Sequence, residues 1–433
     1  MTSDEFPRHQ VASLEEALAA ARIVNLIGPR QVGKTTMVRE LYSKGTYVTL
    51  DDDAVFAAIE TDPAGQLASL AADAAAADGP VIIDEVQRLR NLALAIKRIV
   101  DMDRRKGQFV LTGSSNVFTT MDVADSLAGR MLVLKLWPLT MAEKHRVAPN
   151  RLLDWAAREH PSLDAITLPS TLTRHQYIEH VLEGGFPEAR ELPLKSRQEL
   201  YRSYVDAVVD RDVADLLRVR KTDRLRRLID QMAARTGQEI NVSDLSSLLG
   251  VKRDTVDTYL DVLVRLSLVI KLGAWVSGDA RREVKQPKYH FLDTGMCCAL
   301  RHLGANAFDA GSANATQFGG LMESFVFNEI LRSLPRQETE FRLYHWRSSD
   351  RREIDIIADG GGSLVGIEVK SSATIGKDDF RHLNWFAADG PGKKHRFTGI
   401  VFYQGERKLT FGNRIFGLPV SALWSKIDLS TVN

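Results

Sequence analysis

The stretch RIVNLIGPRQVGKTTMVREL, residues 22–41, decides the fold of the first part of the chain. Residues 23–27 form an apolar run typical of a buried strand, and a helical pattern begins at Lys34. Between them lies the pattern Gly28-x4-Gly33-Lys34-Thr35. This is the P-loop pattern in the strand, loop and helix context that it requires. The sequence therefore predicts a nucleotide-binding loop.

The expected ligand of this loop is ATP with Mg2+. Backbone amides at the beginning of a helix bind phosphate groups well, because their N–H groups point toward the ligand. We expect Lys34 to contact the β- and γ-phosphates and the hydroxyl group of Thr35 to bind Mg2+. The predicted cofactor-binding residues are Gly28, Pro29, Arg30, Gln31, Val32, Gly33, Lys34, Thr35 and Thr36.

Two acids follow a second apolar strand in GPVIIDEVQRL, residues 79–89. A P-loop needs such a strand beside it, with carboxylates at its end. We expect Asp84 to hold Mg2+ directly or through water. We expect Glu85 to polarise the water that attacks the γ-phosphate.

Two further segments provide candidate ATPase residues. QFVLTGSSN, residues 108–116, predicts a third strand ending at the same sheet edge, where Asn116 or the adjacent Ser115 would contact the γ-phosphate or the lytic water. In DSLAGRMLVLKLWPLT, residues 125–140, Arg130 lies between a short helix and a strand. Three roles stay open for Arg130: γ-phosphate sensor, finger acting on a neighbouring subunit, or surface salt bridge.

Length and composition limit the class of protein. A chain of 433 residues predicts two to four domains, and a net charge of +1 means that any nucleic-acid surface is a local patch. No apolar run reaches about 18 residues, and the polar beginning MTSDEFPRHQ does not resemble a signal peptide. The two adjacent cysteines, Cys297 and Cys298, suit neither a disulfide framework nor zinc spacing. We expect a cytoplasmic protein without a membrane partner.

The middle of the chain predicts a winged helix-turn-helix. Residues 224–237, 241–250 and 252–269 read as three helices with short turns, and residues 268–276 and 285–293 read as the strands of a wing. The third helix would present Lys252, Arg253, Thr255 and Thr258 near its beginning. Acidic residues dilute that basic face, so protein interaction stays open as an alternative. The preferred partner is nucleic acid, DNA before RNA.

Near the C-terminal end, REIDIIADGGGSLVGIEVK, residues 352–370, predicts a β-hairpin with a glycine-rich turn. Side chains alternate along a strand, so the hairpin would bring Asp355 close to Glu368 and Lys370. Two carboxylates and a lysine are what a magnesium-dependent phosphodiesterase needs: ligands for the cation and a positive group beside the scissile phosphate. The alternative is a strand whose charges are solvated.

The motifs GPRQVGKTT, VIIDEVQR, LTGSSN, SLAGR, LWPLT and EGGFPEAR occur in this order, followed by KYHFLDTGM and GGLMESFVFNEI. In this combination the chain resembles bacterial and archaeal AAA-type ATPases that carry a C-terminal DUF4143 domain. The resemblance implies a RecA-like ATPase core, a winged helix, and a domain similar to the PD-(D/E)xK nuclease fold.

The resemblance also implies a set of nuclease residues. In that fold a helix glutamate, a strand aspartate and an E-x-K strand converge, and the matching positions are Glu323, Asp355, Glu368 and Lys370. Glu323, Asp355 and Glu368 would be the ligands of Mg2+ or Mn2+. One departure is that EID replaces a proline–aspartate pair, so Glu353 competes with Asp355.

The sequence thus predicts an α/β protein of four parts: a RecA/AAA-like parallel-sheet P-loop core (1–140), a helical lid or linker (141–222), a winged helix-turn-helix (223–310) and an α/β restriction-endonuclease-like domain (311–433). The expected function is ATP hydrolysis coupled to cleavage or binding of DNA or RNA. Assembly into a homo-oligomer is expected if Arg130 acts across a subunit boundary. The alternative function is a signalling-type ATPase switch whose C-terminal half is a catalytically silent binding module for a protein or DNA.

Overall fold

A computed structural model describes residues 6–42, 45–89, 91–113, 127–217, 223–276, 286–308 and 317–430. The chain forms two compact units, Arg8–Leu139 and Thr140–Asn433 with Met1–Pro7. Within the described ranges, no helix has the length and apolar character needed to cross a bilayer.

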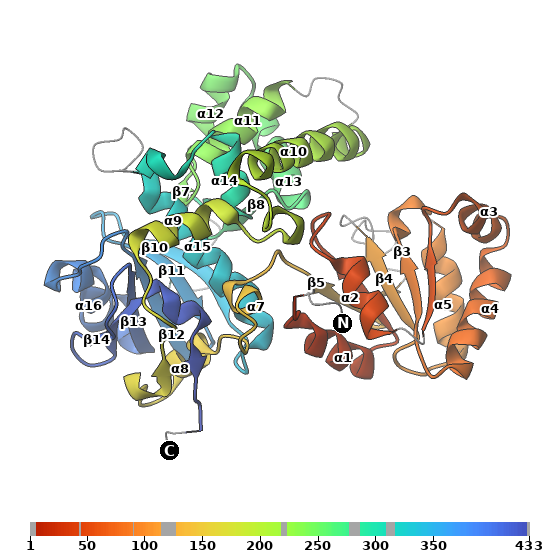
Figure 1. The fold of residues 1–433 in the computed structure, drawn as a ribbon, viewed down its shortest axis with the longest axis horizontal. Helices are drawn as coiled ribbons and strands as arrows, with labels where there is room; N and C mark the ends of the chain where they lie inside the picture. Colours follow the sequence, from red (N-terminus) through yellow and green to blue (C-terminus); the bar gives the residue numbers. More distant parts are fainter. Residues whose placement is uncertain are drawn as a thin grey trace. The chain divides into compact units, whose positions relative to one another are not determined.

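The first unit is built on a five-stranded sheet with the order β2-β3-β4-β1-β5, in which every pair is parallel. Its strands are β1 (Ile23–Ile27), β2 (Thr46–Thr49), β3 (Val81–Asp84), β4 (Phe109–Gly113) and β5 (Met131–Lys135). Its helices are α1 (Gln10–Ala20), α2 (Lys34–Leu41), α3 (Asp53–Thr61), α4 (Pro63–Ala76) and α5 (Leu92–Met102). This is the predicted α/β P-loop core (Figure 1).

Burial explains why the central strands are apolar throughout. Every residue of β1, β3 and β4 is buried, as expected for parallel strands covered on both faces. On one face, Ile23, Val81 and Phe109 pack with apolar residues of α3, α4 and α5. Because the strands are parallel, their carboxyl ends share one edge, and the P-loop after β1 and Glu85 after β3 meet there.

The second unit begins with helices and a small antiparallel sheet of order β7-β9-β8. Its helices are α7 (Met141–Lys144), α8 (Leu152–Ala157), α9 (Arg174–Glu183), α10 (Leu194–Leu217), α11 (Asp223–Ala234), α12 (Val242–Leu249), α13 (Arg253–Arg265) and α14 (Thr294–Leu300). Its strands are β7 (Gln238–Glu239), β8 (Val269–Leu272) and β9 (Lys288–Phe291). Asn241 caps α12 and Gly250 ends it at φ 63°, so the structure has the expected helix-turn-helix and wing strands.

A six-stranded mixed sheet of order β10-β11-β12-β13-β15-β14 forms the rest of this unit. Its strands are β10 (Arg342–Arg347), β11 (Glu353–Asp359), β12 (Ser363–Val369), β13 (Arg396–Tyr403), β14 (Leu409–Thr410) and β15 (Ile415–Pro419). The long helices with it are α15 (Phe318–Ser333) and α16 (Arg381–Ala388), and β6 (Ile166–Thr167) pairs with β16 (Lys426–Ile427). Strands β10 to β12 are antiparallel, whereas β12, β13 and β15 are parallel.

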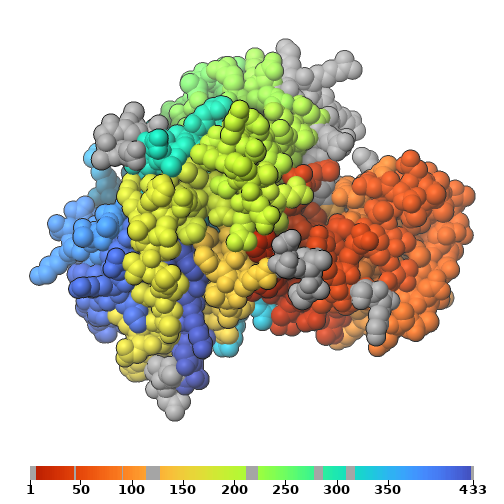
Figure 2. Space-filling model, in the orientation of Figure 1, coloured from red at the N-terminus to blue at the C-terminus, as the bar shows by residue number. Residues whose placement is uncertain are grey.

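The segment for which a helical lid is expected, residues 141–222, lies within this second unit. α8 packs against β12 and β13, and the carbonyl oxygen of Ala156 accepts a hydrogen bond from Thr398. α9 and α10 both pack against α14. The yellow surface of this segment adjoins the blue C-terminal part of the same unit in Figure 2. These contacts make it part of the C-terminal core.

A buried polar network joins the motifs that are separated in sequence. Asp293, at the beginning of α14, accepts hydrogen bonds from the backbone N–H groups of Met296 (3.0 Å) and Gly185 (2.6 Å). Arg332 of α15 lies 3.7 Å from the same carboxylate. Gly295 packs so closely that a Cβ atom there would lie 2.8 Å from the carbonyl oxygen of Glu183. The EGGF, LDTG and α15 segments therefore form one core.

We predict that Asp293→Ala lowers the free energy of unfolding of the second unit by about 3–5 kcal/mol, because it removes a buried carboxylate with an ionic partner. Asp257→Ala, an exposed change on α13, is the matched control and should cost about 0.5 kcal/mol or less. Chemical denaturation followed by circular dichroism measures both. Equal midpoints for the two variants would contradict the prediction.

Candidate functional site

The P-loop adopts a conformation that depends on its glycines. Gly28 has φ 154°, and a Cβ atom there would lie 2.2 Å from the carbonyl oxygen of Leu136. Gly33 has φ 90° and is the residue from which α2 begins. The ammonium group of Lys34 donates hydrogen bonds to the carbonyl oxygens of Gly28 (3.0 Å) and Pro29 (2.8 Å). In this structure these two oxygens satisfy the ammonium group that we expect to contact the phosphates. Burial lowers the pKa of Lys34 to about 8.

Asp84 lies at the end of β3, with both carboxylate oxygens hydrogen-bonded. Thr35 donates to Oδ2 at 2.7 Å and Tyr47 donates to the same oxygen at 3.1 Å. Thr112 and the backbone N–H of Glu85 donate to Oδ1. The structure thus brings together Thr35 and Asp84, the predicted magnesium ligands. Their hydroxyl and carboxylate oxygens are the type of donor that Mg2+ binds, so this edge of the sheet fits ATP with Mg2+.

Tyr47 and Thr112 are site residues that the sequence analysis did not identify. Thr112 precedes the glycine that ends β4, so its place at the functional edge could have been inferred from the strand pattern. Tyr47 comes from β2, which carries no motif. Burial and the carboxylate of Asp84 raise the pKa of Tyr47 to about 12, so its hydroxyl group remains a hydrogen-bond donor.

Glu85, the candidate base, directly follows β3 and has a left-handed backbone with φ 55°. Its carboxylate accepts a hydrogen bond from the side-chain amide of Gln87. In this conformation Glu85 therefore bonds within its own turn, and Gln87 is a further neighbour that sequence reasoning did not identify.

Of the remaining ATPase candidates, Asn116 and Ser115 lie outside the described residues. Arg130 precedes β5, whose first residue pairs with Ile23 at the beginning of β1. The P-loop follows the opposite end of β1, about 13 Å away at the usual strand rise. Arg130 contacts Asp101, with Nε 2.5 Å from Oδ1 and Nη2 3.0 Å from Oδ2. In this structure Arg130 therefore forms the expected salt bridge and lies too far from the P-loop to act as a γ-phosphate sensor in its own chain. A role across a subunit boundary stays a prediction.

In the second unit, the β11–β12 hairpin brings the predicted nuclease residues close together. Ile356 pairs with Ile367, so the same register places Asp355 opposite Glu368. Asp355 Oδ2 accepts a hydrogen bond from the backbone N–H of Val369 (2.9 Å), and Lys370 Nζ lies 3.3 Å from Glu368 Oε2. With Glu323 of α15 and Glu353 of β11, these two acids form what we call the C-terminal acidic cluster (Glu323, Glu353, Asp355 and Glu368).

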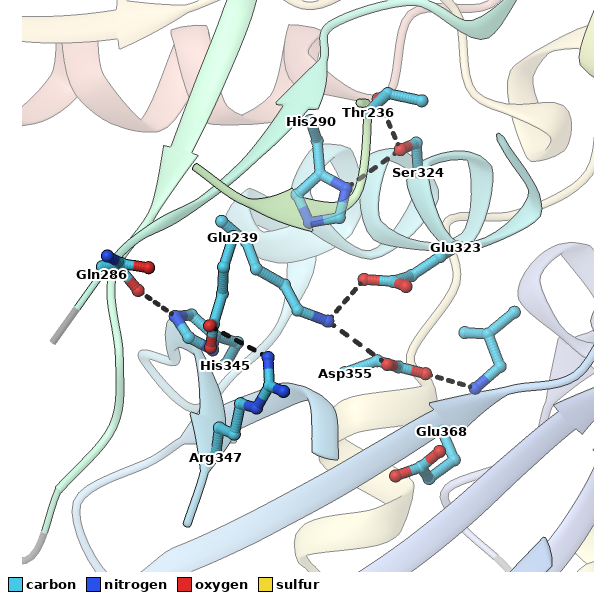
Figure 3. A network of polar contacts seen from close by, with 12 residues as sticks. Thr236, Glu239, Gln286, His290, Glu323, Ser324, His345, Arg347, Asp355 and Glu368 are labelled. Carbon is cyan, nitrogen blue, oxygen red and sulfur yellow. Dashed lines mark hydrogen bonds and ion pairs between the residues drawn. The ribbon is translucent and has the colours of Figure 1, made fainter. Parts of the chain in front are cut away.

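Lys288 also belongs to this site, although the sequence analysis assigned it only to the wing. Its ammonium group lies 2.9 Å from Glu323 Oε1 and 3.3 Å from Asp355 Oδ1, and its side chain is 7% exposed. Figure 3 shows Glu323 and Asp355 converging on one nitrogen atom, which is this Nζ. A signal was present in the strand pattern, since Lys288 and His290 alternate onto one face of β9.

The electrostatics of the cluster follow from burial. Burial, together with repulsion from Asp355, raises the pKa values of Glu323 and Glu368, and the Lys288 ammonium group opposes this effect at Glu323. Burial alone would lower the pKa of Lys288, but Glu323 and Asp355 outweigh this effect and raise it. Lys288 is therefore an ammonium ion.

This arrangement differs from the predicted metal site. The resemblance implies that Glu323, Asp355 and Glu368 converge on a cation, but the Lys288 ammonium group separates Glu323 from Asp355. Among the residues that the structure describes, no group of three or more His, Cys, Asp or Glu side chains could hold a metal ion. These donors, in this conformation, do not fit Mg2+ or Mn2+.

Comparison with known proteins identifies three segments. Residues 20–145 match the AAA domain, residues 174–307 match a domain of unknown function, DUF8612, and residues 318–423 match another, DUF4143. An uncharacterized protein of Mycobacterium tuberculosis is 28% identical over 369 residues, which cover 85% of this chain and 74% of that protein.

Two solved structures align over much of the chain. The Aeropyrum pernix ORC1 protein in complex with DNA has 17% identity, covers 69% of this chain and 93% of its own, and gives a TM-score of 0.27. A signal transduction ATPase with numerous domains from Pyrococcus horikoshii has 12% identity, covers 76% and 48%, and gives 0.28. These scores are too low to equate the overall folds. On the sequence matches and the P-loop geometry, the chain combines an AAA-type ATPase domain with a C-terminal DUF4143 domain.

Proposed function

We propose that this protein hydrolyses ATP and that hydrolysis controls binding of nucleic acid by its winged helix-turn-helix, with DNA preferred over RNA. The observation that carries the ATPase part is the hydrogen bond between Thr35 and Asp84 beside the P-loop. It joins the two motifs that a P-loop ATPase uses for its nucleotide-bound cation.

Each residue of this edge then has a role. The P-loop amides and Lys34 bind the phosphates, and Lys34 exchanges its contacts with Gly28 and Pro29 for phosphate oxygens. Thr35 and Asp84 would hold Mg2+, which supplies neutralisation of the negative charge that develops on the phosphates. Once the Glu85 carboxylate has broken its hydrogen bond with Gln87, it orients and deprotonates the attacking water. Thr112 and Tyr47 keep the Asp84 carboxylate in position.

A basic pocket supports the nucleic-acid part of the proposal. An open pocket of about 550 Å3 lies where α11, α12 and α13 meet, lined by Arg224, Ser246, Ser247, Gly250, Val251, Lys252 and Thr255. The two cations and the Thr255 hydroxyl group suit a backbone phosphate, whereas the hydroxyl groups of Ser246 and Ser247 donate to the carbonyl oxygens of Val251 and Ser243. A helix-turn-helix approaches the wide major groove of B-form DNA, whereas that groove is deep and narrow in RNA helices.

The exposed face of α13 limits how the helix would bind. Asp254, Asp257 and Asp261 are exposed along it and would repel phosphates. We therefore place the phosphate contacts at the beginning of the helix, beside Lys252, and assign no base contacts to its later turns. The competing function, docking of a protein partner, is an outcome of the binding test below.

Cleavage of nucleic acid is the second candidate function. It is supported by the E-x-K strand, where Lys370 pairs with Glu368 beside Asp355. The position of Lys288 weighs against it, because a cation site for the scissile phosphate would have to form where that ammonium group lies. We therefore propose that the C-terminal domain binds nucleic acid without cleaving it while Lys288 occupies this position.

For the ATPase, we predict that Lys34→Ala abolishes nucleotide binding, whereas Glu85→Gln keeps binding and loses about a hundredfold or more in hydrolysis rate. The exposed change Glu60→Gln on α3 is the control and should match the parent. Fluorescent-nucleotide titration and phosphate release measure the two steps separately. If Glu85→Gln hydrolyses ATP at the parent rate, the assignment of the base is wrong.

If Arg130 acts across a subunit boundary, we predict that removing either partner of its salt bridge with Asp101 has a different effect on ATP hydrolysis. Arg130→Ala would lose about a thousandfold in ATP hydrolysis, while Asp101→Ala would retain the parent rate. Mixing Arg130→Ala with Lys34→Ala chains would partly restore hydrolysis, because each supplies what the other lacks. Equal rates for both single variants, or no rescue in chains shown to co-assemble, would leave Arg130 as a salt-bridge residue.

For the pocket, we predict that Arg224→Ala combined with Lys252→Ala weakens duplex DNA binding and lowers the salt dependence of log Kd by about one per lost phosphate contact. Lys195→Ala, an exposed change on α10, should leave both unchanged. Fluorescence anisotropy at several salt concentrations, with DNA and RNA duplexes, measures this, and a plasmid incubated with Mg2+ or Mn2+ tests cleavage. No binding of any duplex by the parent would favour the protein-partner alternative.

A further inference from the structure

We propose that Lys288 takes the place of a divalent cation in the C-terminal acidic cluster, so that the cluster is neutralised by the chain itself and excludes metal. This inference goes beyond ATP hydrolysis and DNA binding and does not rest on either. It concerns a residue whose role follows from its contacts alone.

The position of the ammonium group is the first argument. Lys288 Nζ bridges carboxylates from two different elements, Glu323 of α15 at 2.9 Å and Asp355 of β11 at 3.3 Å. Mg2+ or Mn2+ bound by the same oxygens would lie about 2.0–2.2 Å from each, in the same space. An ammonium group has only donors, so it cannot become a ligand of a cation beside it. The lysine and a metal ion therefore exclude each other.

The second argument is that β9 holds Lys288 firmly against α15. His290, two residues along the strand on the same face, lies 3.0 Å from the Ser324 hydroxyl group. Ser324 also bonds to Thr236 at 2.8 Å, and Thr236 accepts a hydrogen bond from the backbone N–H of Phe291 at 2.9 Å. Figure 3 shows the hydrogen bonds among His290, Ser324 and Thr236 next to Glu323. The backbone at Lys288 is thus fixed beside the helix that carries Glu323.

The third argument is that the cluster contains an acceptor that neither lysine satisfies. Lys288 contacts Glu323 and Asp355, and Lys370 contacts only the Oε2 atom of Glu368. The Glu368 side chain is 4% exposed, and its Oε1 has no hydrogen-bond partner among the described residues. The Nδ1 atom of His382 lies 4.0 Å from it. Removal of the Lys288 charge should therefore let Glu323, Asp355 and Glu368 bind a cation.

The test is titration of Mn2+ into the full chain without nucleotide, followed by electron paramagnetic resonance of free Mn2+. Every protein carries Asp84→Asn, so that the P-loop carboxylate does not contribute. We expect Lys288→Met to bind one additional Mn2+ at least tenfold more tightly than the chain with Lys288. Adding Asp355→Asn to Lys288→Met should abolish this gain.

Lys288→Arg is the matched control, because it keeps the positive charge and should bind no additional Mn2+. A second readout is the Tm, which Mn2+ should raise for Lys288→Met and leave unchanged for the chain with Lys288. Two results would overturn the proposal: binding of Mn2+ by the chain with Lys288 in a manner that Asp355→Asn abolishes, or no gain in a folded Lys288→Met chain. The first result needs no Lys288 variant, so the proposal stays testable if Lys288→Met does not fold.

Discussion

The buried ion pair of Lys288 with Glu323 and Asp355 is the interaction on which the arrangement of the second unit depends. It joins the wing strand β9 to the helix α15 and the strand β11, which lie far apart in the sequence. Removing one partner of such a buried pair typically costs about 3–5 kcal/mol, because the charge that remains cannot be solvated. The winged helix-turn-helix and the mixed sheet are thereby held as neighbouring parts of one core. The backbone contacts of Trp275 and Gly273 with His345 reinforce the same junction.

The two acidic sites of the protein differ in the kind of donor that satisfies their carboxylates. Asp84 accepts hydrogen bonds from the neutral hydroxyl groups of Thr35, Thr112 and Tyr47. The Thr35 hydroxyl group can turn its lone pairs toward a metal ion, so the site can accept a cation without losing a charge. Asp355 is satisfied by an ammonium group instead, which has no lone pair to offer. An aspartate is therefore prepared for a metal at the end of β3 and already neutralised near the beginning of β11.

The sequence predicted the elements that depend on short-range patterns. The P-loop, the acids where β3 ends, the capped helix α12 and the β11–β12 hairpin all follow from local spacing of apolar, glycine and capping residues. It did not predict contacts between distant segments. Lys288 was assigned only to a wing strand because nothing local shows that β9 packs against α15. The packing of α8 on β12 and β13 is a further contact of this kind, which no local pattern in residues 141–222 indicates.

The position of Arg130 shows that a role inferred from a sequence motif also depends on which edge of the sheet the residue occupies. Its place in the chain, between a short helix and a strand, suits a sensor or a finger. Parallel strands, however, enter the sheet at the edge opposite the P-loop, and a residue that precedes a strand must lie at that opposite edge. Within one chain the distance is fixed by the length of β1, and no side-chain rotation closes about 13 Å of it. Arg130 can therefore contact a nucleotide only if a second copy of the chain binds that nucleotide. Assembly of two copies is thus the structural condition for that role.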